Sequence, residues 1–236
     1  MTPDLRYLTT PAAGWINALF IATTLLTAGM LLRLLRPVTL PRTSWLVGIG
    51  GWLAVQAGLA RTGFYQQQLQ HLPPHLVLFG ILPTVAALAW LLLSRRGHAL
   101  TDRLSLPALT ALSMVRVPVE IVLYALAGQH LVPELMTFAG RNFDIVAGLT
   151  APVAAYAYAR GGLGRRGLLA WHLAALALLT TIVGLALLSA PTPLQRLAFA
   201  QPNVAILQFP FVWLPVFVVP VVAFTHLVAL RRLVRG

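Results

Sequence analysis

Seven long apolar runs dominate this chain and leave little freedom in what it can fold into. Each is close to the roughly 20 residues that an α-helix needs to cross the hydrocarbon core of a bilayer. Because backbone polar groups find no water there, helices that satisfy their own hydrogen bonds are expected. The sequence predicts an all-α polytopic membrane protein, a seven-transmembrane-helix bundle that forms one membrane domain over residues 1–236. The runs cover about 14–32, 44–60, 76–94, 105–127, 143–159, 168–190 and 207–230.

The composition agrees with a membrane protein and excludes several kinds of site. Hydrophobic residues make up 58% of the chain and charged residues only 9%, too few to cover a soluble surface. The chain contains no cysteine, which excludes disulfides, thiolate nucleophiles and cysteine-bound metals. It contains no lysine either, which excludes a Schiff base to retinal or pyridoxal phosphate. Nucleic-acid binding is not expected, because the arginines lie between apolar runs instead of on a soluble face.

Arginines are concentrated in every second connection between the apolar runs. Four such segments carry three arginines each, whereas the opposite side of the predicted membrane receives only four in total. Because cytoplasmic loops are enriched in arginine, this bias predicts an outer N-terminus and a cytoplasmic C-terminus, most simply in a bacterial inner membrane. The twelve arginines are Arg33, Arg36, Arg42, Arg95, Arg96, Arg103, Arg160, Arg165, Arg166, Arg231, Arg232 and Arg235.

Two charged residues lie inside the fourth run. Arg116 and Glu120 are four residues apart, so on a helix their side chains share one face. Each costs about 2.5–3.5 kcal/mol at the centre of a bilayer on insertion scales. They therefore form either a ligand- or proton-binding site or an ion pair that ties helices together. Pro118 lies between them and removes one backbone hydrogen bond, so a kink is expected at their depth.

A second polar group precedes the fifth run. Arg141, Asn142 and Asp144 offer a cation, an amide and a carboxylate that are suited to binding a ligand at the mouth of a cavity. The same pattern is typical of a helix start, with Asn142 as N-cap and Asp144 in the first turn. The sequence leaves both interpretations open.

The seventh run carries prolines at regular intervals. Pro210, Pro215 and Pro220 are five residues apart, and each removes a backbone hydrogen bond, which excludes a straight helix. The expected result is a kinked or discontinuous helix that either acts as a gate or simply packs. Asn203 precedes this run and Trp213 lies within it, and both are assigned to the wall of the expected cavity.

An internal similarity links the third and seventh runs. Residues 82–87 read LPTVAA and residues 219–224 read VPVVAF, and each stretch precedes a pair of arginines. Both run in the same direction through the predicted membrane, as a parallel three-plus-one-plus-three repeat requires.

Histidine is the residue type that leaves a cofactor open. His172 and His226 lie near the cytoplasmic ends of the sixth and seventh runs, at similar depth, where they could ligate one haem. Ordinary histidines at a membrane interface would show the same pattern. The chain has no zinc-binding spacing and no nucleophile motif, so no other cofactor and no metal is expected.

These features predict a bundle with a polar cavity that opens to the outer side, lined by the fourth, fifth and seventh runs. The expected function is translocation of a small polar or anionic solute, coupled to protons through Glu120. The alternative is ligand sensing, which would need a partner protein, or an accessory-subunit role in a membrane complex. Lipid modification by an intramembrane enzyme is the third interpretation, although no motif favours an enzyme. The lipid bilayer is the expected environment, and a homo-oligomer is compatible with the sequence.

Overall fold

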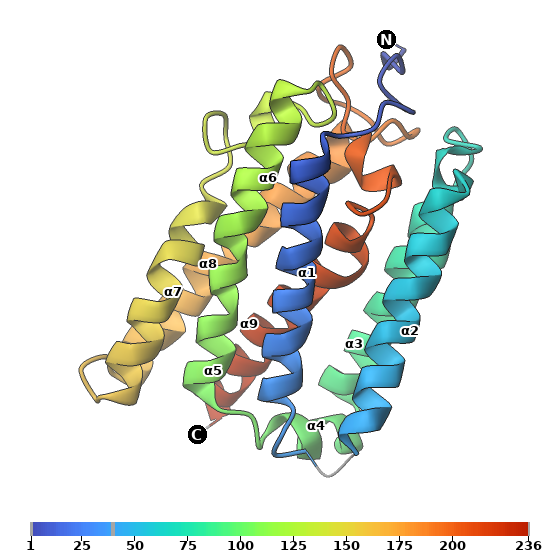
Figure 1. Cartoon of the computed structure of the whole chain (residues 1–236). Helices are drawn as coiled ribbons and strands as arrows, with labels where there is room; N and C mark the ends of the chain where they lie inside the picture. Colours follow the sequence, from blue (N-terminus) through green and yellow to red (C-terminus); the bar gives the residue numbers. More distant parts are fainter. Residues whose placement is uncertain (1, 39–40, 236) are drawn as a thin grey trace.

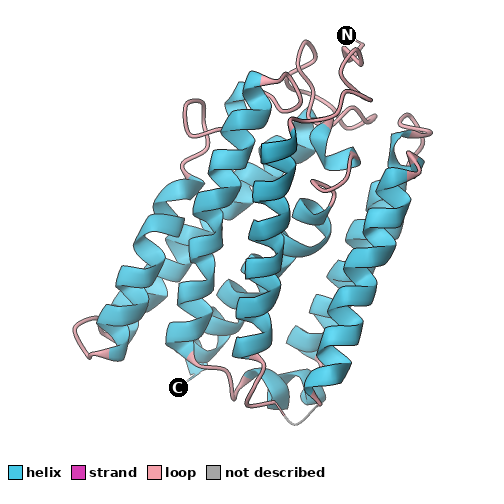
Figure 2. Cartoon of the chain, in the orientation of Figure 1, coloured by secondary structure: helices cyan, strands magenta, loops and turns pink. Residues whose placement is uncertain are grey.

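The computed structural model describes residues 2–38 and 41–235, which form helices and loops without a strand. Figure 2 shows this helical composition, with most of the loops near the two ends of the bundle. The α-helices are α1 (Gly14–Leu34), α2 (Arg42–Arg61), α3 (Leu82–Leu93), α4 (Arg95–Thr101), α5 (Leu106–Ala111), α6 (Arg116–Gly128), α7 (Asp144–Ala159), α8 (Arg165–Ser189) and α9 (Val219–Arg235). Short 3-10 helices are η1 (Phe64–Gln66), η3 (Leu112–Val115), η4 (Glu134–Met136) and η5 (Ala205–Leu207), and π-helices are η2 (Val77–Ile81) and η6 (Leu214–Val218).

Among the described residues, four helical segments are long and apolar enough to cross a membrane. A fifth is counted if the bent pair Val77–Leu93 and Arg95–Thr101, which meet at 81°, forms one span. The helix α7 is shorter, with 16 residues, and α2 is less apolar because it contains several glycines. The structure therefore shows an all-α protein with four to five candidate spans. The four long segments are Gly14–Leu34, Leu106–Gly128, Arg165–Ser189 and Leu214–Arg235.

The predicted apolar runs agree with the observed helices except at two places. The first six ranges match helical segments to within three residues at each end. The seventh range was predicted to start at 207, but the continuous helix starts at Leu214, because the residues before it form short turns around Pro210. The helix α4 was not predicted; the Ser94 hydroxyl caps it by accepting from the Gly97 N–H at 2.9 Å.

The fourth run contains a change of helix type. The elements α5, η3 and α6 follow one another without a break, with the 3-10 turn η3 in the middle. Pro118 lies in the first turn of α6 and cannot donate to the carbonyl of Met114, which belongs to η3. The backbone irregularity expected at Pro118 is therefore present, directly before Arg116.

The prolines of the seventh run shape the start of α9. Pro215 lies in η6, and Pro220 has no N–H to donate to the Val216 carbonyl. That carbonyl instead accepts from Trp52 Nε1 of α2 at 3.1 Å and from Thr84 Oγ1 of α3 at 3.0 Å. Neighbouring helices thus satisfy the backbone group that the proline leaves free, as irregular backbone inside a membrane requires.

The similarity between residues 82–87 and 219–224 has a structural counterpart. In both places a five-residue π-helix leads into an α-helix whose second residue is proline. The two π-helices pack on each other. Gly80 permits this contact, since a Cβ there would lie 2.7 Å from Val216 Cγ1.

The helix α9 packs against α3, α5 and α8, and α6 packs against α1 and α7. Arg116 and Glu120 of α6 and His226 of α9 are buried inside the bundle. Figure 1 shows the two chain termini at opposite ends of the bundle, with α4 at the end where the C-terminus lies.

Candidate functional site

Arg116 and Asp144 form a buried ion pair between α6 and α7. Arg116 Nε donates to Asp144 Oδ2 at 2.6 Å and Nη2 donates to Asp144 Oδ1, so the guanidinium binds both carboxylate oxygens. Nη2 also donates to the Ala175 carbonyl of α8 at 3.0 Å. The two side chains are 3% and 6% exposed, so neither charge is solvated. Bidentate pairing of this kind is among the stronger polar contacts in proteins.

A glycine of α7 allows the two helices to approach at this ion pair. A Cβ on Gly148 would lie 2.8 Å from Val117 Cγ2 and 2.9 Å from the Val117 backbone nitrogen. A larger residue would push α7 away from α6, and with it Asp144 away from Arg116.

The sequence left open a binding site or an ion pair that ties helices together for Arg116 and Glu120; in the described residues Arg116 forms its ion pair with Asp144 and not with Glu120. Both residues of the predicted pair are buried on α6, as their spacing indicated. The carboxylate at the start of α7 nevertheless meets the guanidinium in bidentate geometry, which outweighs the proximity of a residue one turn away.

Glu120 is held by an amide instead of by a charge. Asn142 Nδ2 donates to Glu120 Oε1 at 2.5 Å, and Asn142 Oδ1 accepts from the Asp144 N–H at 3.0 Å. The second carboxylate oxygen, Oε2, is buried and has no hydrogen-bond partner among the described residues. A buried acceptor of this kind is costly unless a proton or a ligand satisfies it.

Of the two roles predicted for Asn142 and Asp144, the helix start is seen in part: Asp144 lies in the first turn of α7, whereas Phe143 and not Asn142 occupies the N-cap position. Asn142 accepts from the Asp144 backbone N–H, so both contribute to the start of the helix. Their role in ligand binding stays a prediction. The same two side chains also contact Glu120 and Arg116. Arg141 lies on the exposed surface, away from this group.

His172 and His226 extend the polar network between α8 and α9. Both are fully buried, and their Nδ1 atoms lie 2.8 Å apart. Thr110 Oγ1 is 3.0 Å from His172 Nε2. Ser113 Oγ is 3.3 Å and Arg116 Nη1 is 3.5 Å from His226 Nε2. A continuous line of polar groups therefore connects Thr110 to the ion pair.

The directions of these hydrogen bonds assign the protonation of both rings. Thr110 Oγ1 donates to the Leu106 carbonyl at 2.9 Å, so it accepts from His172 Nε2–H. His172 Nδ1 then accepts from His226 Nδ1–H, and His226 Nε2 accepts from Arg116. Both histidines are neutral in this assignment, and all four ring nitrogens are used.

This geometry does not favour the haem suggested by the sequence. Two nitrogens that bind one metal from opposite sides lie about 4 Å apart, given metal–nitrogen bonds of about 2 Å. The Nδ1 atoms of His172 and His226 lie only 2.8 Å apart, so haem ligation stays a prediction. Within the described ranges, no three His, Asp or Glu side chains gather as metal ligands.

A cavity of about 390 Å³ lies beside Glu120. It is bounded mainly by α3, α6, α8 and α9, and most of the side chains that line it are apolar. Glu120 and Asp144 are the acidic residues of the lining, which includes no arginine. The cavity thus differs from the expected polar one, because α7 contributes only Asp144 while α3 and α8 contribute apolar side chains.

The loop that follows α2 also lines this cavity and contributes its polar side chains Tyr65, Gln67 and His75. The Tyr65 hydroxyl donates to Gln56 Oε1 at 2.5 Å. Burial raises the pKa of Tyr65 to about 12, so the hydroxyl remains a donor at neutral pH.

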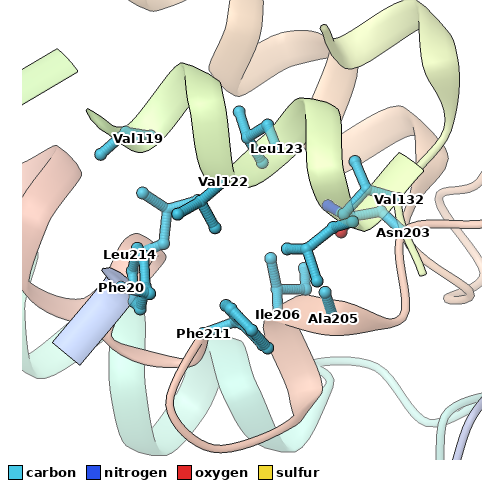
Figure 3. A pocket seen from close by; sticks show the side chains of 11 residues that line it. Phe20, Val119, Val122, Leu123, Val132, Asn203, Ala205, Ile206, Phe211 and Leu214 are labelled. Carbon is cyan, nitrogen blue, oxygen red and sulfur yellow. The ribbon is translucent and has the colours of Figure 1, made fainter. Parts of the chain in front are cut away.

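Asn203 and Trp213 do not line the cavity beside Glu120. Asn203 lies at a separate pocket of about 10 Å³ (Figure 3), which has room for roughly one water molecule. Both polar atoms of its side chain are buried without a partner among the described residues. Trp213 Nε1 donates to the Leu53 carbonyl at 2.9 Å and so attaches the seventh run to α2.

Two polar residues of the network, Thr110 and Ser113, were missed by the sequence analysis. They precede Arg116 by six and three residues, and Glu120 follows it by four. Such spacing places all four on one face of a helix. A polar stripe along an otherwise apolar run was therefore the signal that could have found them.

Comparisons with known proteins bear on the family of this chain and not on its activity. No curated protein and no solved structure matches it. A family model described as a domain of unknown function (DUF8737) matches residues 72–234, which include the ion pair, Glu120 and both buried histidines. Because this match covers more than half of the chain, the protein belongs to the DUF8737 family.

Proposed function

We propose that the protein is a seven-span transporter of a bacterial cytoplasmic membrane, in which Glu120 binds a small solute or a proton. The observation that carries this proposal is Glu120 Oε2, which is buried without a partner among the described residues in a side chain that lines a cavity of about 390 Å³. The Asp144 carboxylate, by contrast, is neutralised by Arg116. An ionisable group inside a membrane protein without a charged partner is typical of a proton or ligand site.

Seven spans result if α2, α7 and the bent pair of α3 and α4 are counted with the four long helices. An odd number of passes agrees with the termini at opposite ends of the bundle (Figure 1). The four arginine-rich segments lie at helix ends on the side of the C-terminus. The positive-inside rule places that side in the cytoplasm and the N-terminus outside.

Single introduced cysteines should report this orientation, because the chain has no cysteine of its own that would also be labelled. Gln70 and Gly164 are exposed and lie in loops at opposite ends of the bundle, and a Cβ at Gly164 meets nothing within 4 Å. We expect a membrane-impermeant maleimide to label Gln70→Cys in intact cells and to label Gly164→Cys only after permeabilisation. The opposite pattern would reverse the topology.

The contacts of the charged residues favour a solute with hydrogen-bond donors over an anion. Arg116 uses Nε and Nη2 on Asp144 and Ala175 and does not line the cavity. Glu120 does line the cavity, and its acceptor Oε2 is buried without a partner among the described residues. The proposal is accordingly narrowed to cationic or neutral solutes. Ligand sensing, an accessory-subunit role, lipid modification and homo-oligomerisation stay predictions of the sequence.

Replacing Glu120 by Gln should abolish proton movement coupled to solute uptake. Gln keeps an oxygen that accepts from Asn142, but it cannot bind and release a proton. Proteoliposomes with an internal pH-sensitive dye are offered a panel of amines, neutral amino acids and sugars. A solute that moves protons through the wild type should give no signal with Glu120→Gln.

Glu134→Gln is the matched control, because it makes the same chemical change at an exposed position. It should behave like the wild type. Equal proton movement in the wild type and Glu120→Gln would contradict the proposed role of Glu120.

A further inference from the structure

The cavity beside Glu120 forms a groove lined by α3, α6, α8 and α9. Both α3 and α8 pack on α9. Val85 of α3 and Leu187 of α8 line the cavity, yet they are 49% and 44% exposed. The groove therefore reaches the surface of the protein between α3 and α8.

The surface around this opening is apolar and lies on helices that the proposed topology places in the bilayer. Val85 and Leu187 would meet lipid chains there and not water. A molecule that is already dissolved in the lipid could pass between α3 and α8 without exposing apolar surface to water. A strongly hydrated solute would have to lose its water first.

The charge of the lining decides which head group fits. Asp144 is neutralised by Arg116, so Glu120 is the acidic side chain of the lining that lacks a cationic partner. Its Oε2 atom offers an acceptor in surroundings of low polarity, where a charged or neutral donor gains most. An anionic head group would instead meet a carboxylate.

We infer that the cavity takes an amphiphile directly from the outer half of the bilayer. Its apolar body would lie between α3 and α8, and an amine or another donor head group would bind Glu120 Oε2. The outer half is assigned because Tyr65, Gln67 and His75, which belong to the loop that the proposed topology places outside, line the cavity. The volume lies at the lower end of about 300–1,000 Å³, the usual range for small-molecule sites, which suits a single-chain molecule. This inference names the solute class of the proposed transporter and rests on that function.

Two carbodiimides of different solubility test the route to Glu120. When a carbodiimide reacts with the Glu120 carboxyl group, the carboxyl proton passes to a carbodiimide nitrogen and the carboxylate oxygen bonds to the central carbon. This adduct rearranges to a stable N-acylurea, which mass spectrometry locates in the sequence. Dicyclohexylcarbodiimide dissolves in lipid, whereas its ethyl-dimethylaminopropyl analogue stays in water. In proteoliposomes we expect the lipid-soluble reagent to modify about tenfold more Glu120 than the water-soluble reagent does. The transfer of only two additional methylene groups from water into lipid already enriches a molecule by that factor.

Competition on the wild-type protein tests the head group. Dodecylamine should protect Glu120 from dicyclohexylcarbodiimide at roughly tenfold lower concentration than dodecanoate, because a single charge-assisted hydrogen bond is worth that factor. Val183→Trp on α8 narrows the groove and should also reduce the labelling. Equal protection by dodecylamine and dodecanoate would overturn the assigned head group.

The two reagents separate failure of this inference from failure of the proposed function. Labelling of Glu120 by the water-soluble reagent alone would overturn entry from lipid and leave the transporter proposal standing. Labelling of exposed Glu134 but not of Glu120 by both reagents would overturn both, because Glu120 would then be closed to ligands. Glu120→Gln must lose the modification if the label is assigned correctly.

Discussion

Replacing Arg116 by Met should lower the free energy of unfolding by about 3–5 kcal/mol, because it leaves a buried carboxylate without its cationic partner. Asp144, whose side chain is 6% exposed, would lose both of its hydrogen bonds from the guanidinium. The Ala175 carbonyl would lose a donor as well. Unfolding of the purified protein in detergent, followed by tryptophan fluorescence, measures the effect.

Double variants distinguish the two acidic residues that lie near Arg116. Arg116→Met combined with Asp144→Leu should recover much of the lost stability, since no unpaired charge of the pair remains buried. Arg116→Met combined with Glu120→Gln should recover little, because Glu120 is bound by Asn142 and not by Arg116. Recovery in the second double variant and not in the first would contradict the Arg116–Asp144 pair.

The helices could be predicted closely from the sequence, because length and hydropathy are local properties of a run. The fifth run was predicted over 143–159 and α7 covers Asp144–Ala159. The prediction failed at the start of the seventh run, where residues 207–213 are apolar but lack continuous helix. Hydropathy does not separate an apolar helix from an apolar loop whose polar backbone is satisfied by other segments.

The partner of Arg116 could not be predicted, because it depends on where a loop returns to the bundle. The helix α6 continues for twelve residues beyond Arg116, yet Asp144 at the start of α7 lies beside it. The segment between the two helices must therefore run back along α6. It is held by contacts distant in sequence, such as the Val204 N–H, which donates to the Leu131 carbonyl at 3.1 Å. Such contacts leave no pattern in the local sequence.

The apolar cavity could not be predicted either, although the sequence did identify Glu120, which lies in its wall, as a candidate site residue. A buried charge is recognisable in a sequence because its cost inside a membrane is high. Apolar side chains that face lipid, a neighbouring helix or a cavity have the same hydropathy. Val85 and Val183 line the groove, but nothing in their runs distinguishes them from the valines that pack in the core.

Replacing His226 by Leu should lower the free energy of unfolding by about 1–3 kcal/mol for each buried group that it leaves without a partner. His172 Nδ1 would lose its donor, and Arg116 Nη1 would lose an acceptor at 3.5 Å. His71→Leu at an exposed position is the control and should change stability little. Adding His172→Phe to His226→Leu should restore part of the lost stability, because it removes the Nδ1 atom that His226→Leu leaves without a donor. Thr110 still donates to the Leu106 carbonyl in this double variant. A haem absorption spectrum in the wild type that this double variant lacks would show instead that the two histidines serve as ligands.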